Sequence, residues 1–63
     1  MLNAEQRSLL KLFDLSSREK AIEDMLTKLP FIKYPEMTSQ VQRIMRKLMK
    51  MSDFEFALLK KRL

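Results

Sequence analysis

The stretch that decides the fold is residues 37–51, Met-Thr-Ser-Gln-Val-Gln-Arg-Ile-Met-Arg-Lys-Leu-Met-Lys-Met. Apolar side chains recur along it in alternating steps of four and three residues, at Met37, Val41, Ile44, Leu48 and Met51. This spacing places them on one stripe of an α-helix, like the seam along which two helices pack. The stretch therefore predicts an amphipathic helix that packs along its whole length.

Three further helices are expected, and their starts are marked by capping boxes. In a capping box, a Ser or Asn side chain and a Glu or Gln three residues later each bond the other's backbone N–H. The pairs are Asn3 with Gln6, Ser16 with Glu19, and Ser52 with Glu55. The predicted fold is all-α, a compact bundle of four short helices at about 3–14, 16–29, 36–51 and 52–63, in one domain spanning 1–63.

The link between the second and third predicted helices contains both prolines of the chain, Pro30 and Pro35. Pro30 disfavours helical geometry at the residue before it, so the second helix should stop there or earlier. Pro35 suits the first turn of the next helix, where its missing N–H is not needed. Between them, Phe31, Ile32 and Tyr34 are expected to fold back onto the core.

Composition excludes several kinds of site. The 63 residues include no Gly, no Cys and no His. Without Gly there is no P-loop and no dinucleotide-binding fingerprint, and tight β-hairpins are disfavoured. Without Cys and His, disulfides are excluded and zinc or most transition-metal sites lack their usual ligands. We therefore expect no cofactor and no metal.

Catalysis also lacks candidate residues. No His is present to act as a base near neutral pH, and there is no Cys nucleophile. Glu19, Glu23 and Asp24 could form a paired-carboxylate site, but their spacing is more typical of a solvated helix face. The chain is therefore expected to be no enzyme and to have no small-molecule substrate.

Small size points to a partner. A chain of this length buries only about 60% of the surface that its unfolded form exposes. Small folds usually gain stability from disulfides, a metal or association, and the first two have been set aside. A protein partner, a homodimer or both are therefore expected.

The Met-rich helix is the predicted protein-binding surface. Met45 widens the stripe and Met49 lies outside it, and Met is common on surfaces that adapt to partners. We expect Val41, Ile44 and Leu48 to pack internally while Met45 and Met49 meet another chain, although a small core can also use Met as filler. The last predicted helix is apolar on several sides, which is typical of a helix that is central or covered by another chain. The predicted protein-binding residues are Met37, Val41, Ile44, Met45, Leu48, Met49, Met51, Phe54, Phe56 and Leu59.

A basic surface supports a second hypothesis. Residues 1–32 carry five basic and five acidic side chains, whereas residues 33–63 carry eight basic ones against Glu36, Asp53 and Glu55. Such asymmetry indicates nucleic acid, an anionic membrane or an acidic partner, or else serves only solubility. The candidate nucleic-acid-binding residues are Gln42, Arg43, Arg46, Lys47, Lys50, Lys60, Lys61 and Arg62. Against this hypothesis, the basic residues gather towards helix C-termini, where the helix dipole favours cations without any ligand.

Membrane association is not expected. No secretory signal and no apolar run long enough to span a bilayer are visible, and the basic helix lacks the aromatic side chains typical of interfacial helices. A cytoplasmic location follows as the expectation. The leading hypothesis is a non-enzymatic helical regulator or adaptor that binds protein and self-associates. The alternative is a small DNA-binding regulator that uses helix 36–51.

Overall fold

The computed structural model describes residues 2–63, which form four α-helices and a short 3₁₀ helix with no strand among them. The elements are α1 (Ala4–Leu10), α2 (Arg18–Lys28), η1 (Leu29–Phe31), α3 (Pro35–Lys50) and α4 (Asp53–Arg62). The predicted all-α architecture of four short helices is confirmed.

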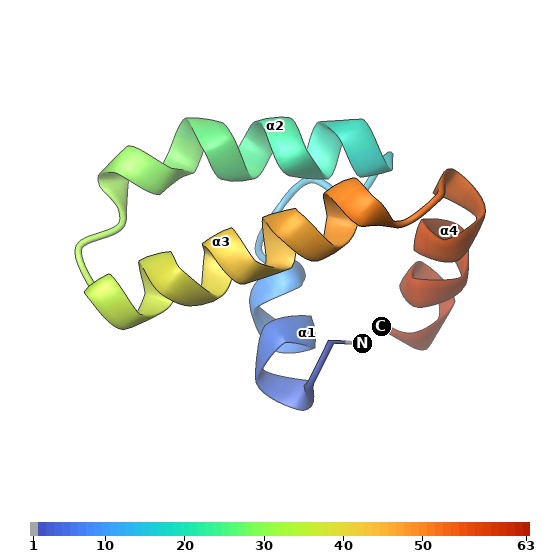
Figure 1. The fold of residues 1–63 in the computed structure, drawn as a ribbon, viewed down its shortest axis with the longest axis horizontal. Helices are drawn as coiled ribbons and strands as arrows, with labels where there is room; N and C mark the ends of the chain where they lie inside the picture. The colour runs from blue at the N-terminus through green and yellow to red at the C-terminus, as the bar shows by residue number, and fades with distance from the viewer. Residues whose placement is uncertain (1) are drawn as a thin grey trace.

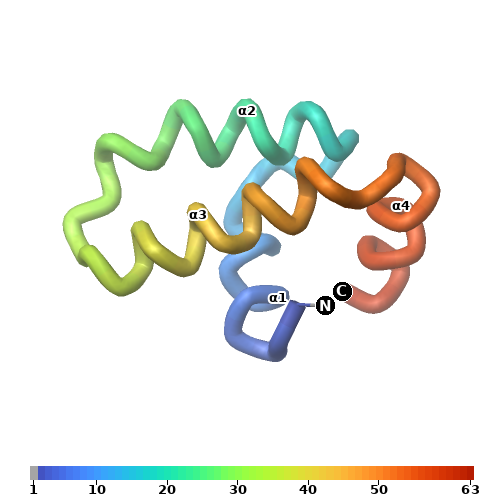
Figure 2. The backbone as a smooth tube through the Cα atoms, viewed as in Figure 1, coloured from blue at the N-terminus to red at the C-terminus, as the bar shows by residue number. Residues whose placement is uncertain are grey.

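The helices are arranged around α3. α2 and α3 run side by side in opposite directions, joined through η1 at one end (Figure 1). α1 also contacts α3, and α4 lies at the end of the molecule where α3 finishes. The described chain begins beside α4 (Figure 2), where Leu2 lines a depression together with Leu59 and Arg62. α3 therefore packs against two helices, one on each side of its apolar stripe.

The core is built from side chains of every helix. Leu10 of α1, Met25 of α2 and Ile44 of α3 are fully buried, and Phe56 of α4 is 3% exposed. The complete buried set is Leu2, Leu10, Phe13, Ala21, Met25, Val41, Ile44, Met45, Leu48 and Phe56. Most of the predicted stripe of α3 is thus the central part of the core.

Two of the three predicted capping boxes form. The Asn3 side chain accepts from the N–H of Gln6 at 2.8 Å, and the Ser52 hydroxyl accepts from the N–H of Glu55 at 3.1 Å, each with the reciprocal bond present. The prediction for Ser16 is wrong, because Ser17 caps α2 by accepting from the N–H of Lys20. The N–H of Ser16 instead bonds a carboxylate oxygen of Asp14 at 2.9 Å, in the turn before the helix.

The first helix is shorter than predicted. It ends at Leu10, not near Asp14, because the N–H groups of Leu12 and Phe13 bond carbonyls three residues back, which tightens the chain into a turn. The N–H of Asp14 then donates to the Asp24 carboxylate of α2 at 2.8 Å. This bond between distant segments fixes the turn, and local helix propensity could not reveal it.

The link between α2 and α3 also differs from the prediction. Ile32 is partly buried against the core, but Phe31 and Tyr34 are exposed, so the expectation that both aromatic rings fold inward is wrong. Leu29 and Met37, on either side of the link, are also partly buried against the core. Together with Ile32 they cover this end of the core, and the two aromatic rings lie outside it.

Candidate functional site

The apolar stripe of α3 is used by the fold itself. Val41, Ile44 and Leu48 have no exposed surface, and Met45 is only 6% exposed. The expectation that Met45 faces another chain is therefore wrong. Since α3 packs against both α1 and α2, its apolar stripe must be wide enough to contact two helices, and Met45 belongs to that wider stripe. Met49, at 54% exposed, is the one residue of the pair that reaches the surface.

α4 carries two apolar faces, and only one of them packs on the core. Its inner face holds Phe56, which is buried, with Leu59 partly buried beside it. On the opposite side Phe54 is 72% exposed, and Ala57 and Leu58 are also exposed. Residues at i, i+3 and i+4 share one side of a helix. We call Phe54, Ala57 and Leu58 the outer stripe.

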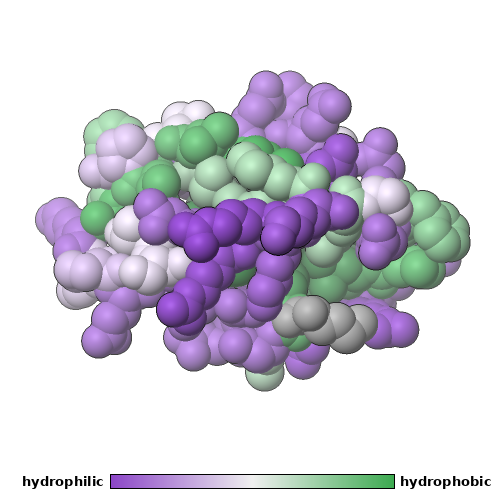
Figure 3. All heavy atoms as spheres, in the orientation of Figure 1, coloured by the Kyte–Doolittle hydropathy of each residue, from purple (hydrophilic) through white to green (hydrophobic). Residues whose placement is uncertain are grey.

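The outer stripe faces away from the rest of the molecule. α4 lies at one edge of the fold, so it is not a central helix covered on all sides (Figure 1). In the space-filling view, hydrophobic atoms gather over the end of the molecule that α4 occupies (Figure 3). The position of α4 thus excludes one explanation for a short helix that is apolar on several sides, that it is central in the fold.

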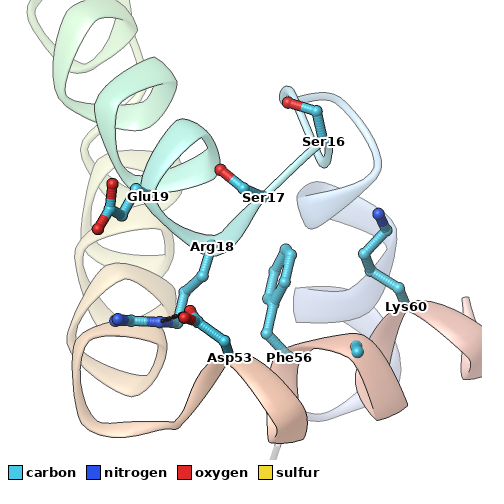
Figure 4. Close-up of a pocket in the computed structure, with 8 residues that line it drawn as sticks. Ser16, Ser17, Arg18, Glu19, Asp53, Phe56 and Lys60 are labelled. Atoms are coloured by element: carbon cyan, nitrogen blue, oxygen red, sulfur yellow. Dashed lines mark hydrogen bonds and ion pairs between the residues drawn. The ribbon is translucent and has the colours of Figure 1, made fainter.

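On one side of the outer stripe, α4 and the start of α2 form a hollow of about 360 Å³, which we call the α2–α4 hollow. It is lined by Ser16, Ser17, Arg18, Glu19, Asp53, Phe56, Ala57 and Lys60 (Figure 4). The Arg18 guanidinium joins the two helices. It bonds the Asp53 carboxylate at 2.9 Å and the carbonyl of Leu48 at 3.1 Å. Lys60 lies 6.0 Å from the centre of the Phe56 ring.

On the other side of the stripe, α4 and the N-terminal segment form a second depression of about 260 Å³, which we call the N-terminal groove. It is lined by Leu2, Arg7, Met51, Glu55, Leu58, Leu59 and Arg62. The outer stripe is therefore flanked by Asp53 and Lys60 on one side and by Glu55 and Arg62 on the other.

The predicted basic residues separate into two groups. Gln42, Arg43, Arg46 and Lys50 are exposed on α3, where hydrophilic atoms cross the front of the molecule (Figure 3). Among residues 2–63, no ion pair joins these three basic side chains to a carboxylate. Lys47 is partly buried and bonds the side chain of Gln6, so it belongs to the contact between α1 and α3.

The second basic group lies on α4. Lys60, Lys61 and Arg62 are exposed in its last turn, where the helix dipole favours cations. The predicted nucleic-acid-binding residues thus lie on two helices, α3 and α4, and do not form one continuous group. One of them, Lys47, takes part in the contact between α1 and α3.

Of the three carboxylates considered as a paired site, Glu23 and Asp24 form contacts within the fold, whereas Glu19 is exposed and lines the α2–α4 hollow. Asp24 accepts from the N–H of Asp14 and from Lys28, and Glu23 pairs with Lys20 at 3.7 Å. Within residues 2–63, no cluster of three or more His, Cys, Asp or Glu side chains could hold a metal ion. No helix in the same range is long and apolar enough to cross a membrane.

Two exposed carboxyls have perturbed pKa values with local causes. Hydrogen bonds from the Ser16 backbone and hydroxyl lower the pKa of Asp14, and those from Ser52 lower the pKa of Glu55. A lowered pKa keeps each carboxylate charged, as a turn or a cap requires. It does not prepare either group for proton transfer near neutral pH.

Sequence reasoning missed two features of this site. Leu58 was not among the predicted residues, although its spacing from Phe54 places both on one helical side. For Gln6, the sequence predicted the capping box with Asn3 but not its contacts with other helices. Its buried amide contacts Gln40 and Lys47 across the fold, which no local pattern indicates.

Comparisons with curated proteins and with solved structures give no match. Residues 2–60 match the TTRAP family, whose description is "Putative transposon-transfer assisting protein". The match takes in α1, α2 and α3 completely and most of α4, including the whole outer stripe. The chain belongs to the TTRAP family.

Proposed function

We propose that this TTRAP-family chain is a non-enzymatic accessory protein of transposon transfer that acts by binding another polypeptide through the outer stripe of α4. One observation carries the proposal: α4 has a second apolar face, with Phe54 72% exposed, that its own fold does not use. Exposed apolar surface that forms a contiguous face is typical of protein-binding sites.

The energetics of the stripe support this role. Burying a Phe or Leu side chain contributes about 1.5–3 kcal/mol. Phe54 and Leu58 are one helical turn apart, so a partner can cover both at once, as in other interfaces that seat apolar anchors of one helix in a groove. Ala57 between them lets the partner approach closely.

Other features of the chain favour binding over catalysis. The chain has no His and no Cys, and two of the three carboxylates of α2, Glu23 and Asp24, are engaged in contacts within the fold. The Ser16 hydroxyl in the α2–α4 hollow does bond the Asp14 carboxylate, but the lowered pKa of that carboxylate makes it a weak base near neutral pH. We therefore assign the exposed surface of α4, and not a catalytic centre, as the functional site.

The proposal is tested by the frequency of transposon transfer in cells that lack the chain and are complemented with variants. The variant Phe54→Asp with Leu58→Glu should lower the frequency at least about tenfold, since losing 1.4 kcal/mol of contact energy lowers affinity tenfold. The matched control is Leu26→Glu, which places a charge at an exposed Leu of α2. Full transfer by the α4 variant, at equal expression, would refute the proposal.

A second candidate function, DNA binding, is favoured by the three exposed basic residues of α3 that lack acidic partners within residues 2–63. If Arg43, Arg46 and Lys50 each neutralise one phosphate, the logarithm of the affinity should fall with the logarithm of salt with a slope of about −2.7. Replacing all three with Gln should remove that slope. No binding of duplex DNA at about 50 mM salt would exclude this function.

A further inference from the structure

We propose that the occupant of the outer stripe is a second copy of this chain, with the two α4 helices packed antiparallel about a two-fold axis between Ala57 and Leu58. This inference rests on the proposed function, because it names the partner of the same face. Three features of α4 carry it: the symmetry of the stripe, the placement of charge beside it, and the direction of the helix.

The stripe can pair with itself. Phe54, Ala57, Leu58 and Lys61 follow the spacing i, i+3, i+4 and i+7, which places all four on the exposed side of α4. In an antiparallel pair centred between Ala57 and Leu58, Phe54 lies opposite Lys61 of the second copy. The aliphatic stem of Lys61 covers the ring while its ammonium stays in water or lies over the ring face. Ala57 and Leu58 lie on different sides of the stripe next to the axis, so each faces the same residue of the second copy: the small Ala57 side chains let the helices approach, and the two Leu58 side chains pack together.

The charges beside the stripe determine the direction. Asp53 and Lys60 line the α2–α4 hollow, and Glu55 and Arg62 line the N-terminal groove. Each side of the stripe thus has an acid in the first turn and a base seven residues later. A two-fold axis perpendicular to the helices places each side of the stripe next to the same side of the stripe on the second copy. Asp53 then meets Lys60 of the second copy, and Glu55 meets Arg62.

The opposite direction is disfavoured. A parallel pair would place acid beside acid in the first turn and base beside base in the last, and like charges in such positions repel. It would also align the two helix dipoles, whereas the antiparallel pair opposes them. Charge complementarity of α4 with its own reversed copy therefore favours this occupant over a protein of unrelated sequence.

The contacts within one chain are compatible with this arrangement. Asp53 bonds Arg18 through one carboxylate oxygen, and Glu55 accepts the N–H of Ser52 through one of its own. Both residues are exposed, so a second oxygen of each remains accessible. The interface consists of one helix of 10 residues from each copy. Such a contact falls below about 1,200 Å² in total, the size of weak, transient interfaces.

Sedimentation equilibrium of the whole chain from about 10 μM to about 1 mM tests the association. The average mass should rise from monomer to dimer across this range. Phe54→Asp with Leu58→Glu should abolish the rise. Lys60→Glu with Arg62→Glu should weaken association at least tenfold. The control Arg43→Glu with Arg46→Glu, which changes the net charge equally on α3, should leave it unchanged.

Single cysteines test the direction, since the chain has none of its own. In the antiparallel pair, two Ala57→Cys residues lie near the axis and should form a disulfide when an oxidant is added. Two Lys61→Cys residues lie seven positions apart along the pair, about 10 Å, which is beyond disulfide reach. Linkage of Lys61→Cys as fast as that of Ala57→Cys would overturn the antiparallel arrangement.

The outcomes also separate this inference from the proposed function. If the chain stays monomeric throughout the concentration range, while the Phe54→Asp, Leu58→Glu variant fails in transposon transfer, the second copy is overturned and another protein covers the stripe. If the chain dimerises through α4 but that variant supports full transfer, the dimer stands and the proposed function fails.

Discussion

Met45 and Met49 lie one helical turn apart on α3, yet the fold treats them differently. Met45 is buried in the core and Met49 is more than half exposed. The sequence shows that both lie beside the apolar stripe. It does not show that α3 has a helix on each side, and the number of neighbours decides how wide a stripe must be. Hydrophobic spacing thus predicted the helix correctly but not the limits of its buried face.

The two methionines give a matched pair of variants. Met45→Lys should remove most of the free energy of unfolding, because it places an ammonium group in the core of a domain whose total is about 3–9 kcal/mol. Met49→Lys should change it by less than about 0.5 kcal/mol. Urea unfolding followed by circular dichroism measures both. Equal effects would contradict the placement of Met45.

Gln6 is a buried polar residue whose amide is bonded on both sides. Its nitrogen donates to Gln40 at 3.1 Å, and its oxygen accepts from Lys47 at 3.0 Å and from the N–H of Asn3 at 3.2 Å. Gln6→Ala should lower the free energy of unfolding by about 1–3 kcal/mol, since it leaves buried groups without partners. Gln42→Ala on the exposed side of α3 is the control, and a similar loss there would refute this role.

At the scale of elements, the sequence predicted that the four helices exist, but it predicted only some of the residues at which they begin and end. The starts of α1 and α4 followed from local capping boxes, because all atoms of a box lie within four residues. The end of α1 depends on the bond from Asp14 to Asp24, ten residues away. The start of α2 depends on the turn at Asp14, which moves the cap from Ser16 to Ser17. Local patterns cannot include such contacts.

Adjacent serines test the position of the α2 cap. Ser17→Ala should lower the free energy of unfolding by about 1 kcal/mol, because it removes the acceptor for the N–H of Lys20. Ser16→Ala should have a smaller effect, since Ser16 caps no helix. The midpoints of urea unfolding of the two variants show which serine caps α2. A larger loss for Ser16→Ala would show that the S-x-x-E spacing marks the true start.

The capping box of α4 predicts a pH dependence. Hydrogen bonds from Ser52 lower the pKa of Glu55, so folding favours its charged form. This contribution to stability is fully present above the ordinary pKa of 4.5 and is lost as the pH falls through the lower value in the folded chain. Glu55→Gln should therefore flatten the fall in unfolding free energy below that pH. Urea titrations of both chains at a series of acidic pH values measure it, and identical profiles would contradict it.

At the scale of the whole molecule, the core buries the apolar stripe of α3 but only one of the two apolar faces of α4. The sequence indicated that α4 is apolar on several sides, which left two explanations open. The position of α4 at the edge of the fold excludes the explanation that it is a central helix, and this position depends on how all the helices pack (Figure 1). The proposed site therefore lies on α4, whose pattern is apolar on two sides, and not on the Met-rich helix, where the apolar spacing is most regular.

The division of α4 into an inner and an outer face is tested most directly by the free energies of unfolding of Phe54→Ala and Phe56→Ala at low concentration. Phe56→Ala should lose about 3–5 kcal/mol, enough to unfold much of the population, because it opens a cavity in the core. Phe54→Ala should lose less than about 0.5 kcal/mol, as a surface substitution does. Equal losses would contradict the account, because the outer stripe would then belong to the core and no partner could bind it.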